Sequence, residues 1–187
     1  MHDGEFSGNP QTEWLSERGD DRDMRVIAPF WYIDPAGRRW DAPAGTIING
    51  ASIPRTLWSS LGSPYTGDYR RAALVHDAAV GREGVLRGEA DTMFHFACLS
   101  GGCSRLQAKL LYAGVRLGAW AGANQAPVLE PLGAAPGAYR LPGQQTPQEL
   151  ELRARYTIIA NELMAAGDNY SDIEHIVDRH LGAQPRR

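Results

Sequence analysis

The stretch ALVHDAAVGREGVLRGEADTMF, residues 73–94, decides the fold at the centre of the chain. Its two ends repeat apolar residues at helical spacing, and the segment between them contains glycine, so two helices are expected, over 67–80 and 86–100. A connection of only about five residues makes such helices antiparallel neighbours. Residues equally far from the turn then face each other. This predicts that His76 and Asp91 are in contact, at hydrogen-bond distance or through one water.

A histidine and a carboxylate in this position have three interpretations. His76 falls on the apolar stripe of its helix, so its imidazole should point inward. It is a general base for water, oriented by Asp91, a satisfied core residue that ties two helices together, or a residue that binds a metal or another ligand. Asp77 lies about 100° further around the helix, so it cannot hold the same imidazole but could face a cation or an oxyanion.

Upstream of these helices, the sequence indicates strands. Residues 24–48 alternate β-branched and aromatic side chains around the turn sequence DPAG, which predicts a hairpin with strands at roughly 24–33 and 38–48. A short helix should follow. Downstream, Ser104 is a candidate N-cap for a third long helix. The fold class is therefore α+β, with an N-terminal β-hairpin or small antiparallel sheet packed on a mainly helical core.

The C-terminal part predicts a helical hairpin on a linker. Residues 122–145 hold four prolines and four glycines without a helical or strand period, which is typical of a linker or an extended arm. Capping boxes at Thr146 and Ser171 then begin two helices. The chain thus divides into a main domain, 1–121, this linker, and a helical tail, 146–187. So small a tail either packs back on the main domain or binds a partner protein.

Composition limits the classes of function. The chain has 43% hydrophobic and 22% charged residues, as in ordinary soluble globular proteins. A formal net charge of -3 with scattered Lys and Arg makes nucleic acid an unexpected partner. The start lacks a signal-peptide pattern, and the most apolar stretch, interrupted by Arg116, is far short of the ~20 residues that span a bilayer. We therefore expect no transmembrane segment and a protein that is cytoplasmic as synthesised, any export following a route without a signal peptide. Cys98 and Cys103 should be reduced thiols.

Four segments, in order, resemble the signature of a bacterial and phage family classed as a domain of unknown function, DUF1353. The resemblance covers residues 24–119 and implies a phage, prophage or secreted-effector context, without an established activity. Asn49 stands where the family usually has Asp, and Val80 where it usually has Tyr, so any support these positions give to a metal or a carboxylate would be altered here. The segments are NGASIP (49–54), the helix with His76 and Asp77, RGEAD (87–91) and YAGVRLG (112–118).

The order of parts is also similar to that of secreted phospholipases A2. In those enzymes a HDxxY helix provides the base and a calcium ligand, and an aspartate on an antiparallel helix orients the base. The resemblance assigns these functions to His76, Asp77 and Asp91 in turn, and it implies calcium as the cofactor, although the calcium loop and the framework cysteines are missing. The residues by themselves imply no cofactor.

Candidate substrate contacts are small polar residues of a loop, arginines and aromatic residues. A loop of small polar residues before a helix N-terminus is a ready anion or carbonyl site. Arginines can hold an anionic substrate but usually pair with nearby acids, and large aromatics are more often core than ligand contacts. The predicted contacts are Asn49, Gly50, Ser52, Arg55, Trp58, Tyr69 and Arg87.

Two hypotheses for the function follow. The first is a small hydrolase acting on an ester or amide of a lipid or cell-envelope molecule, with His76 as base, Asp91 as its orienter, and Asp77 with the loop 49–52 at an oxyanion or a cation. The second is a non-enzymatic module of a phage particle or a secretion apparatus. In that case residues 146–182 bind a protein partner and the His-Asp helix is core. The first requires that the His76 and Asp91 pair lie at the floor of a cleft walled by residues 49–58.

Overall fold

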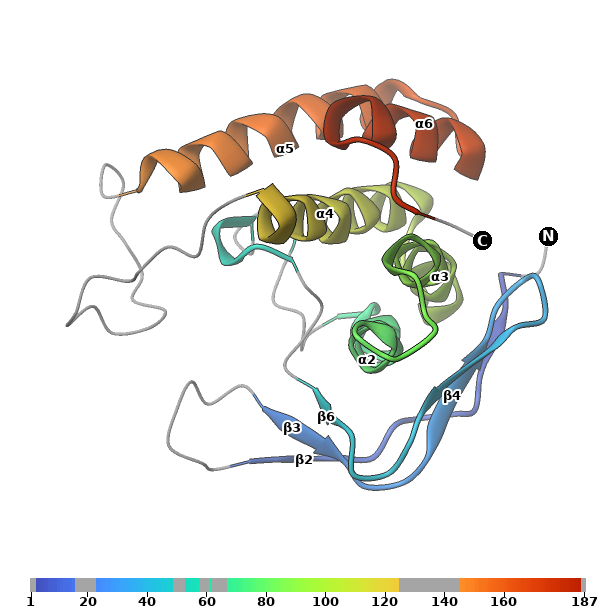
Figure 1. Ribbon diagram of the computed structural model, residues 1–187. Coiled ribbons are helices and arrows are strands. Elements are labelled where there is room, and N and C mark those ends of the chain that lie inside the picture. Colours follow the sequence, from blue (N-terminus) through green and yellow to red (C-terminus); the bar gives the residue numbers. More distant parts are fainter. Residues whose placement is uncertain are drawn as a thin grey trace.

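A computed structural model describes residues 3–15, 23–48, 53–57, 61, 67–124 and 145–185 of the chain. The fold is α+β, as predicted: small antiparallel sheets lie on one side of a helical core, and a helical hairpin lies on the other (Figure 1). The strands are β1 (Glu5–Phe6), β2 (Thr12–Trp14), β3 (Met24–Val26), β4 (Phe30–Ile33), β5 (Arg39–Ala42) and β6 (Ile47–Ile48). The helices are the 3-10 turn η1 (Arg55–Leu57), α2 (Arg70–Ala79), α3 (Arg87–Gly101), α4 (Arg105–Asn124), α5 (Pro147–Ala165) and α6 (Tyr170–Leu181).

The predicted hairpin forms at the DPAG turn, between β4 and β5. Asp34 organises this turn, because its Oδ1 accepts hydrogen bonds from the backbone N–H groups of Ala36 and Arg38, each at 2.9 Å. Its Oδ2 accepts from the indole Nε1 of Trp40 at 2.9 Å. Gly37 has φ of 83°, which a residue without Cβ adopts at little cost. Turn chemistry thus places the strands as the sequence indicates.

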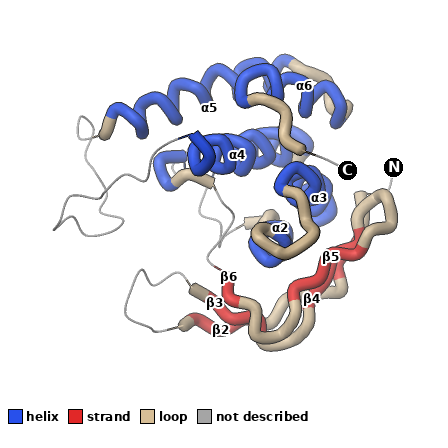
Figure 2. The backbone as a smooth tube through the Cα atoms, viewed as in Figure 1, coloured by secondary structure: helices blue, strands red, loops and turns tan. Residues whose placement is uncertain are grey.

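The two predicted strands, 24–33 and 38–48, are each broken in two. Pro29 follows β3 and Pro43 follows β5, and proline cannot donate to a strand ladder. The result is two three-stranded antiparallel sheets, with orders β1-β4-β5 and β2-β3-β6 (Figure 2). The outer strands β1 and β2 were not predicted, since two or three residues are too few to show a period of two.

The helical layers place the buried side chains around α2, α3 and α4. α2 lies between the sheets and α3, and α3 packs on α4 (Figure 1). Gly114 of α4 lets the chain before α2 approach closely: a Cβ there would lie 2.9 Å from Cδ1 of Leu61 and 3.5 Å from Ile53. Ser104 caps α4 as predicted, its Oγ accepting from the N–H of Gln107 at 3.1 Å.

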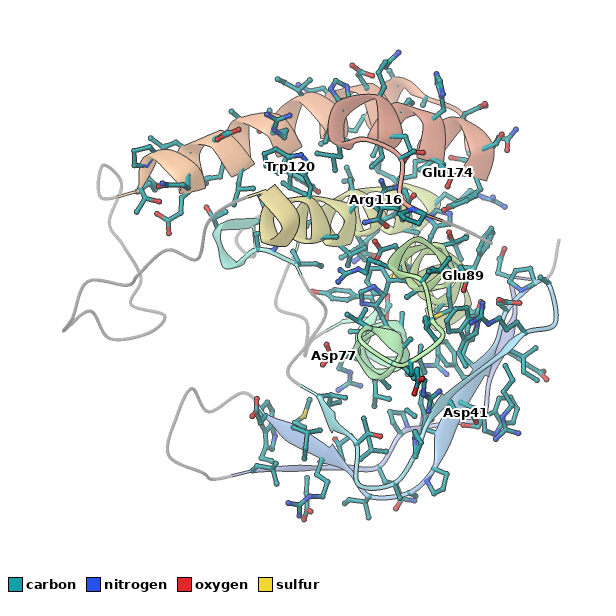
Figure 3. The ribbon with its side chains drawn as sticks, in the orientation of Figure 1. Asp41, Asp77, Glu89, Arg116, Trp120 and Glu174 are labelled. Carbon is teal, nitrogen blue, oxygen red and sulfur yellow. The ribbon has the colours of Figure 1, made fainter. Side chains whose placement is uncertain are left out.

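The tail hairpin packs back on the main domain. Ile159 and Leu163 of α5 and Ile173 and Val177 of α6 are buried at this packing, and α4 lies beneath both helices (Figure 1). At one end, the Lys109 ammonium donates to the carbonyl of Ala166 at 2.9 Å and pairs with Asp168 at 2.7 Å. At the other, the guanidinium of Arg155 lies 4.3 Å from the ring centroid of Trp120 (Figure 3).

One of the two predicted helix caps in the tail is wrong. Thr146 and Glu149 form the expected capping box at the start of α5. At α6, however, the N-cap is Asn169, whose side-chain oxygen accepts from the N–H of Ser171 at 3.1 Å. An amide two residues upstream therefore displaces the predicted cap at Ser171, because Asn is as strong an N-cap as Ser. α6 ends at Gly182, as predicted, with φ of 82°.

The division into 1–121, 122–145 and 146–187 stays a prediction, and most of the predicted linker lies outside the described residues. α4 runs on to Asn124, slightly beyond the predicted boundary. Among the helices of the described chain, none combines the length and apolar character of a membrane span.

Candidate functional site

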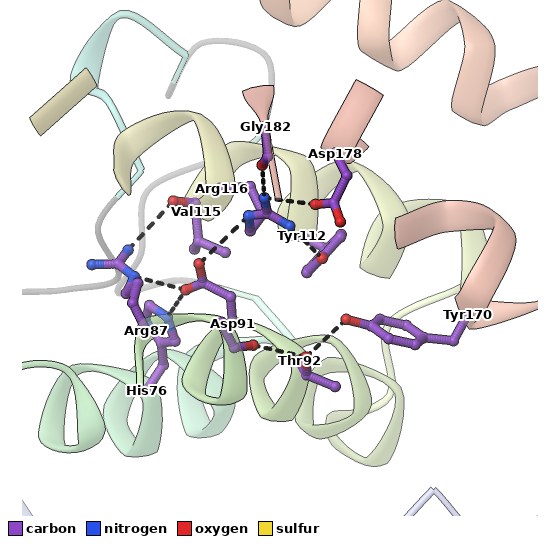
Figure 4. A network of polar contacts seen from close by, with 11 residues as sticks. His76, Arg87, Asp91, Thr92, Tyr112, Val115, Arg116, Tyr170, Asp178 and Gly182 are labelled. Carbon is purple, nitrogen blue, oxygen red and sulfur yellow. Dashed lines mark hydrogen bonds and ion pairs between the residues drawn. The ribbon is translucent and has the colours of Figure 1, made fainter. Parts of the chain in front are cut away.

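The antiparallel helices α2 and α3 bring His76 and Asp91 together, as the spacing predicts. The Nε2 of His76 lies 2.7 Å from Oδ1 of Asp91, and both side chains are buried, at 0% and 1% exposure (Figure 4). The ring of Phe94 packs against the imidazole with centroids 4.9 Å apart. Geometry and packing therefore fix the orientation of the ring, which is the first requirement for a histidine base.

Two arginines complete the surroundings of the Asp91 carboxylate. Arg87, one turn earlier on α3, donates from Nε to the same Oδ1 at 2.9 Å and from Nη2 to the carbonyl of Val115 at 3.3 Å. Arg116 of α4 places its Nε 3.9 Å from Oδ2 (Figure 4). Burial raises the pKa of Asp91, but the hydrogen bond and charge of His76, with the charge and hydrogen bond of Arg87, outweigh it and leave the pKa below its usual value. Asp91 is thus an ionised carboxylate at neutral pH.

The second imidazole nitrogen of His76 has no hydrogen-bond partner among the described residues. That atom, Nδ1, is buried. Because Nε2 donates to an ionised carboxylate, the neutral ring carries its proton on Nε2 and presents a lone pair at Nδ1. A buried polar atom without a partner costs roughly 1–3 kcal/mol, so its presence requires an explanation.

Arg116 links this site to the C-terminal tail, and sequence analysis missed it. Its guanidinium donates to the Tyr112 hydroxyl at 2.8 Å and to the carbonyl of Gly182 at 2.9 Å, and it pairs with Asp178 at 2.8 Å (Figures 3 and 4). Burial would lower the pKa of Arg116, yet Tyr112 and Asp178 raise it above its usual value. The available signal was an arginine within an otherwise apolar helical stretch, since a buried arginine must be paired.

The other predicted catalytic residue, Asp77, lies on a different face of α2 from His76. It is half-buried, and Figure 3 shows it on the side of α2 away from α3. Within the described ranges, no three or more His, Cys, Asp or Glu side chains gather in a group that could hold a metal ion. The loop 49–52, which was predicted to act with Asp77 at an oxyanion or a cation, lies outside the described residues, so calcium stays a prediction.

The predicted substrate contacts divide into three groups. Arg87 joins the pair, as described above. Tyr69 is buried at the start of α2, its hydroxyl donates to the Leu61 carbonyl at 3.5 Å, and burial raises its pKa to about 12. The remaining contacts lie outside the described residues, except that the backbone of Arg55 belongs to η1. They are Asn49, Gly50, Ser52, Trp58 and the side chain of Arg55.

The predicted cleft is not seen in the described part of the chain. A cavity of about 610 Å³ is present there, but neither His76 nor Asp91 lines it. It lies instead between the β2-β3-β6 sheet and the first turn of α2. The predicted wall, residues 49–58, is mostly outside the described residues, so the catalytic assignment stays a prediction.

Three further side chains of interest lie one helix turn or more away from the pair. His95 is buried among the rings of Phe96, Tyr112 and Tyr170. Cys98 and Cys103 are both free and buried. Burial raises the pKa of Cys98, whereas its hydrogen bond to Cys103 lowers the pKa of the latter.

Residues 24–115 match the family described as Protein of unknown function (DUF1353). This range contains His76, Arg87 and Asp91, and Arg116 follows directly after it. This match confirms the resemblance over residues 24–115, and the network around Asp91 joins the end of that matched region to α6. The family description assigns no activity.

Two curated relatives come from Sinorhizobium fredii (strain NBRC 101917 / NGR234). The uncharacterized protein y4jT is 31% identical over 110 residues, which are 58% of this chain and 32% of that protein. The uncharacterized protein y4iH is 35% identical over 97 residues, 52% of this chain and 41% of that protein. The chain thus aligns with less than half of each relative. No solved structure matches the chain significantly.

Proposed function

We propose that the chain is a hydrolase in which Nδ1 of His76 takes a proton from an attacking water. The observation that carries this proposal is the arrangement of the imidazole: Nε2 is held by Asp91 at 2.7 Å, and the buried Nδ1 has no partner among the described residues. Asp91 would keep the ring in the tautomer that exposes a lone pair at Nδ1 and would stabilise the imidazolium that forms.

The charges around Asp91 suit this function. A depressed pKa keeps the carboxylate ionised, so it attracts the imidazolium more strongly than the neutral ring. Arg87 and Arg116 hold the carboxylate and are positioning residues in this proposal. Asp77 points elsewhere, and no step of the proposed reaction uses a metal ion.

The proposed substrate is an ester or amide of a lipid or cell-envelope molecule. Apolar side chains surround the pair, with Phe94 directly against the imidazole, and they would favour an acyl group over a charged substrate. The context of a phage, prophage or secreted effector rests on the family resemblance alone.

The experiment compares two substitutions of His76, each of which places an amide group at the position of one of the two imidazole nitrogens. His76→Gln puts an amide N–H near Nε2, so it retains a donor for Asp91 but has no base. His76→Asn puts its amide near Nδ1 and loses the contact with Asp91. The matched control is His175→Gln on the exposed side of α6. Hydrolysis is measured with p-nitrophenyl esters of two to twelve carbons and with phospholipid vesicles, and thermal midpoints are measured in parallel.

We expect His76→Gln to lower kcat/KM by about 10²-fold or more while its thermal midpoint stays within a few degrees. His175→Gln should match the unsubstituted chain. If the chain hydrolyses none of these substrates faster than His76→Gln does, the proposal is wrong in this form. A large fall in the midpoint of His76→Gln, without a fall in kcat/KM beyond the unfolded fraction, would make His76 a structural residue.

A second candidate function is a non-enzymatic module that binds a protein partner through its tail. The outer face of α5 favours it, because Leu150, Ile158 and Met164 are each more than half exposed there. Deleting the tail would also uncover the buried Arg116, so substituting these three residues by Ser is the cleaner test. This candidate requires a partner that the unsubstituted chain and His76→Gln retain in a pull-down and the triple variant loses. Equal retention by the triple variant would exclude the outer face of α5.

A further inference from the structure

The cavity of about 610 Å³ has one apolar wall and one basic wall. The apolar wall belongs to the β2-β3-β6 sheet, where Trp14 pairs with Met24 and Met24 pairs with Ile48 across neighbouring strands. Because alternate residues of a strand point to opposite faces, this cross-strand row lies on a single face of the sheet. The next residues along β2 and β3 point the other way, where Glu13 and Arg25 form an ion pair at 3.0 Å.

The facing wall is the first turn of α2, which begins with two consecutive arginines. Arg70 and Arg71 both line the cavity, one residue after the buried Tyr69. Neither forms an ion pair with any residue in the described part of the chain, whereas eight other described arginines do. The guanidinium of Arg71 lies 4.7 Å from the centroid of the Phe6 ring, which holds it at the cavity.

The charge of the described lining is therefore positive. Among the lining residues that the structure describes, Asp68 is the single acid, against two arginines, in a chain whose formal net charge is -3. The partial positive charge at the N-terminus of α2 adds to the same field. A volume of this size accommodates a small organic molecule. Trp14, which is 60% exposed, offers such a molecule a large flat surface.

We infer that this cavity binds a small amphiphilic anion: a phosphate or carboxylate group held by Arg70 and Arg71, with an aromatic or acyl group against Trp14, Met24 and Ile48. The inference does not depend on the proposed function, since neither His76 nor Asp91 lines the cavity. Guanidinium groups bind both kinds of anion through paired hydrogen bonds, and the apolar row supplies the contact area.

The test measures binding of four probes to the full chain by calorimetry. Phenyl phosphate combines an aromatic ring with a phosphate, and benzoate combines an aromatic ring with a carboxylate. Inorganic phosphate lacks the apolar part, and benzyl alcohol lacks the charge. We expect phenyl phosphate, benzoate or both to bind with a lower Kd than inorganic phosphate and benzyl alcohol, and their order tells which anion the cavity prefers.

Variants assign that binding to the cavity. The double substitution Arg70→Gln with Arg71→Gln should raise the Kd of the tighter aromatic anion by about tenfold or more, because it removes both charged donors. Trp14→Ala should raise the Kd of that anion several-fold and leave inorganic phosphate unchanged. Arg82→Gln is the matched control: Arg82 is an exposed arginine beyond the other end of α2 and does not line the cavity.

Two results would overturn the inference. One is the absence of saturable binding of either aromatic anion at millimolar concentration. The other is binding that the double arginine variant and Arg82→Gln weaken equally, because the attraction would then come from the general charge of the surface. Thermal midpoints of all variants show that a changed Kd does not reflect unfolding, and hydrolysis by His76 plays no part in any of these measurements.

Discussion

The guanidinium of Arg116 lies 2.8 Å from Oδ1 of Asp178, and this ion pair joins α4 to α6 around an arginine side chain that is only 2% exposed. Replacing Asp178 by Asn removes the nearest counter-charge while keeping the shape of the side chain. Asp178 is 26% exposed, so the cost should be smaller than for a fully buried pair. We expect a loss of about 2 kcal/mol in the free energy of unfolding, measured by urea denaturation.

The matched control for this prediction is Glu151→Gln. Glu151 pairs with Arg155 at 3.1 Å, one turn apart on α5, with both side chains a third or more exposed. An exposed pair of this kind contributes about 0.5 kcal/mol or less. If Asp178→Asn cost no more than the control, the tail would be held by its apolar side chains alone.

His95 should make the chain less stable in mild acid. Its imidazole is 3% exposed, and burial lowers its pKa to about 4, against a hydrogen bond with the Ala108 backbone that raises it. In the unfolded chain a histidine titrates near ~6.5, so between these values the unfolded state binds more protons. The neutral imidazole of His95 therefore contributes fully to the free energy of unfolding above about pH 6.5. This contribution is lost as the pH falls towards about 4, at up to ~1.4 kcal/mol per pH unit.

Urea midpoints of the unsubstituted chain and of His95→Gln, measured between pH 4.5 and pH 7, check this dependence. The amide keeps a donor for the Ala108 backbone but does not titrate, so the slope in this window should flatten. His175→Gln, at an exposed position, should leave the slope unchanged. Asp91 cannot cause the same effect. Its pKa is depressed, so the stability that it contributes is lost only as the pH falls below the usual pKa of a carboxyl group. An unaltered slope in His95→Gln would show that other groups cause the acid sensitivity.

The contact between His76 and Asp91 was predictable because it depends on local geometry. Apolar periodicity fixes the two helices, a short connection makes them antiparallel, and counting from the turn then pairs the residues. The turn at Asp34 was predictable for the same reason. Such features can be predicted because they depend only on residues that are close together in the sequence.

Features that depend on distant parts of the chain were not predicted. Nothing near Arg116 in the sequence indicates Asp178 or Gly182 as its partners, because α6 reaches it only after the tail folds back. Likewise, β2 forms part of the cavity wall, and this strand has only three residues. So short a segment shows no sequence pattern that would predict its pairing with β3. The sequence shows Arg116 only as an interruption of an apolar stretch, and it indicates neither the burial of this side chain nor the groups that neutralise it.

Substituting two helical glycines by alanine should change stability in opposite directions. Gly101 ends α3, and a Cβ there would lie 2.5 Å from the carbonyl oxygen of Asp68, so Gly101→Ala must displace the backbone that leads into α2. We expect a loss of about 1–3 kcal/mol. Gly122 of α4 has nothing within 4 Å of its Cβ position, so Gly122→Ala should gain up to about 1 kcal/mol from helix propensity. Urea denaturation of both variants measures the signs, and equal signs would contradict the prediction.

The structure and the sequence pattern assign the N-cap of α6 to different residues, Asn169 and Ser171, and substituting each residue tests which assignment is right. Asn169 accepts from the N–H of Ser171 at 3.1 Å, and the Ser171 hydroxyl only adds a donor to the same oxygen, also at 3.1 Å. Asn169→Ala leaves the first turn of α6 without its acceptor and should cost about 1 kcal/mol, whereas Ser171→Ala should cost a few tenths at most. The capping box predicted from the sequence requires the reverse order, because Ser171 would then be the cap. Free energies of unfolding for the two variants therefore decide between the caps, and since α6 carries Asp178, the costlier variant should also weaken the hold of the tail on Arg116.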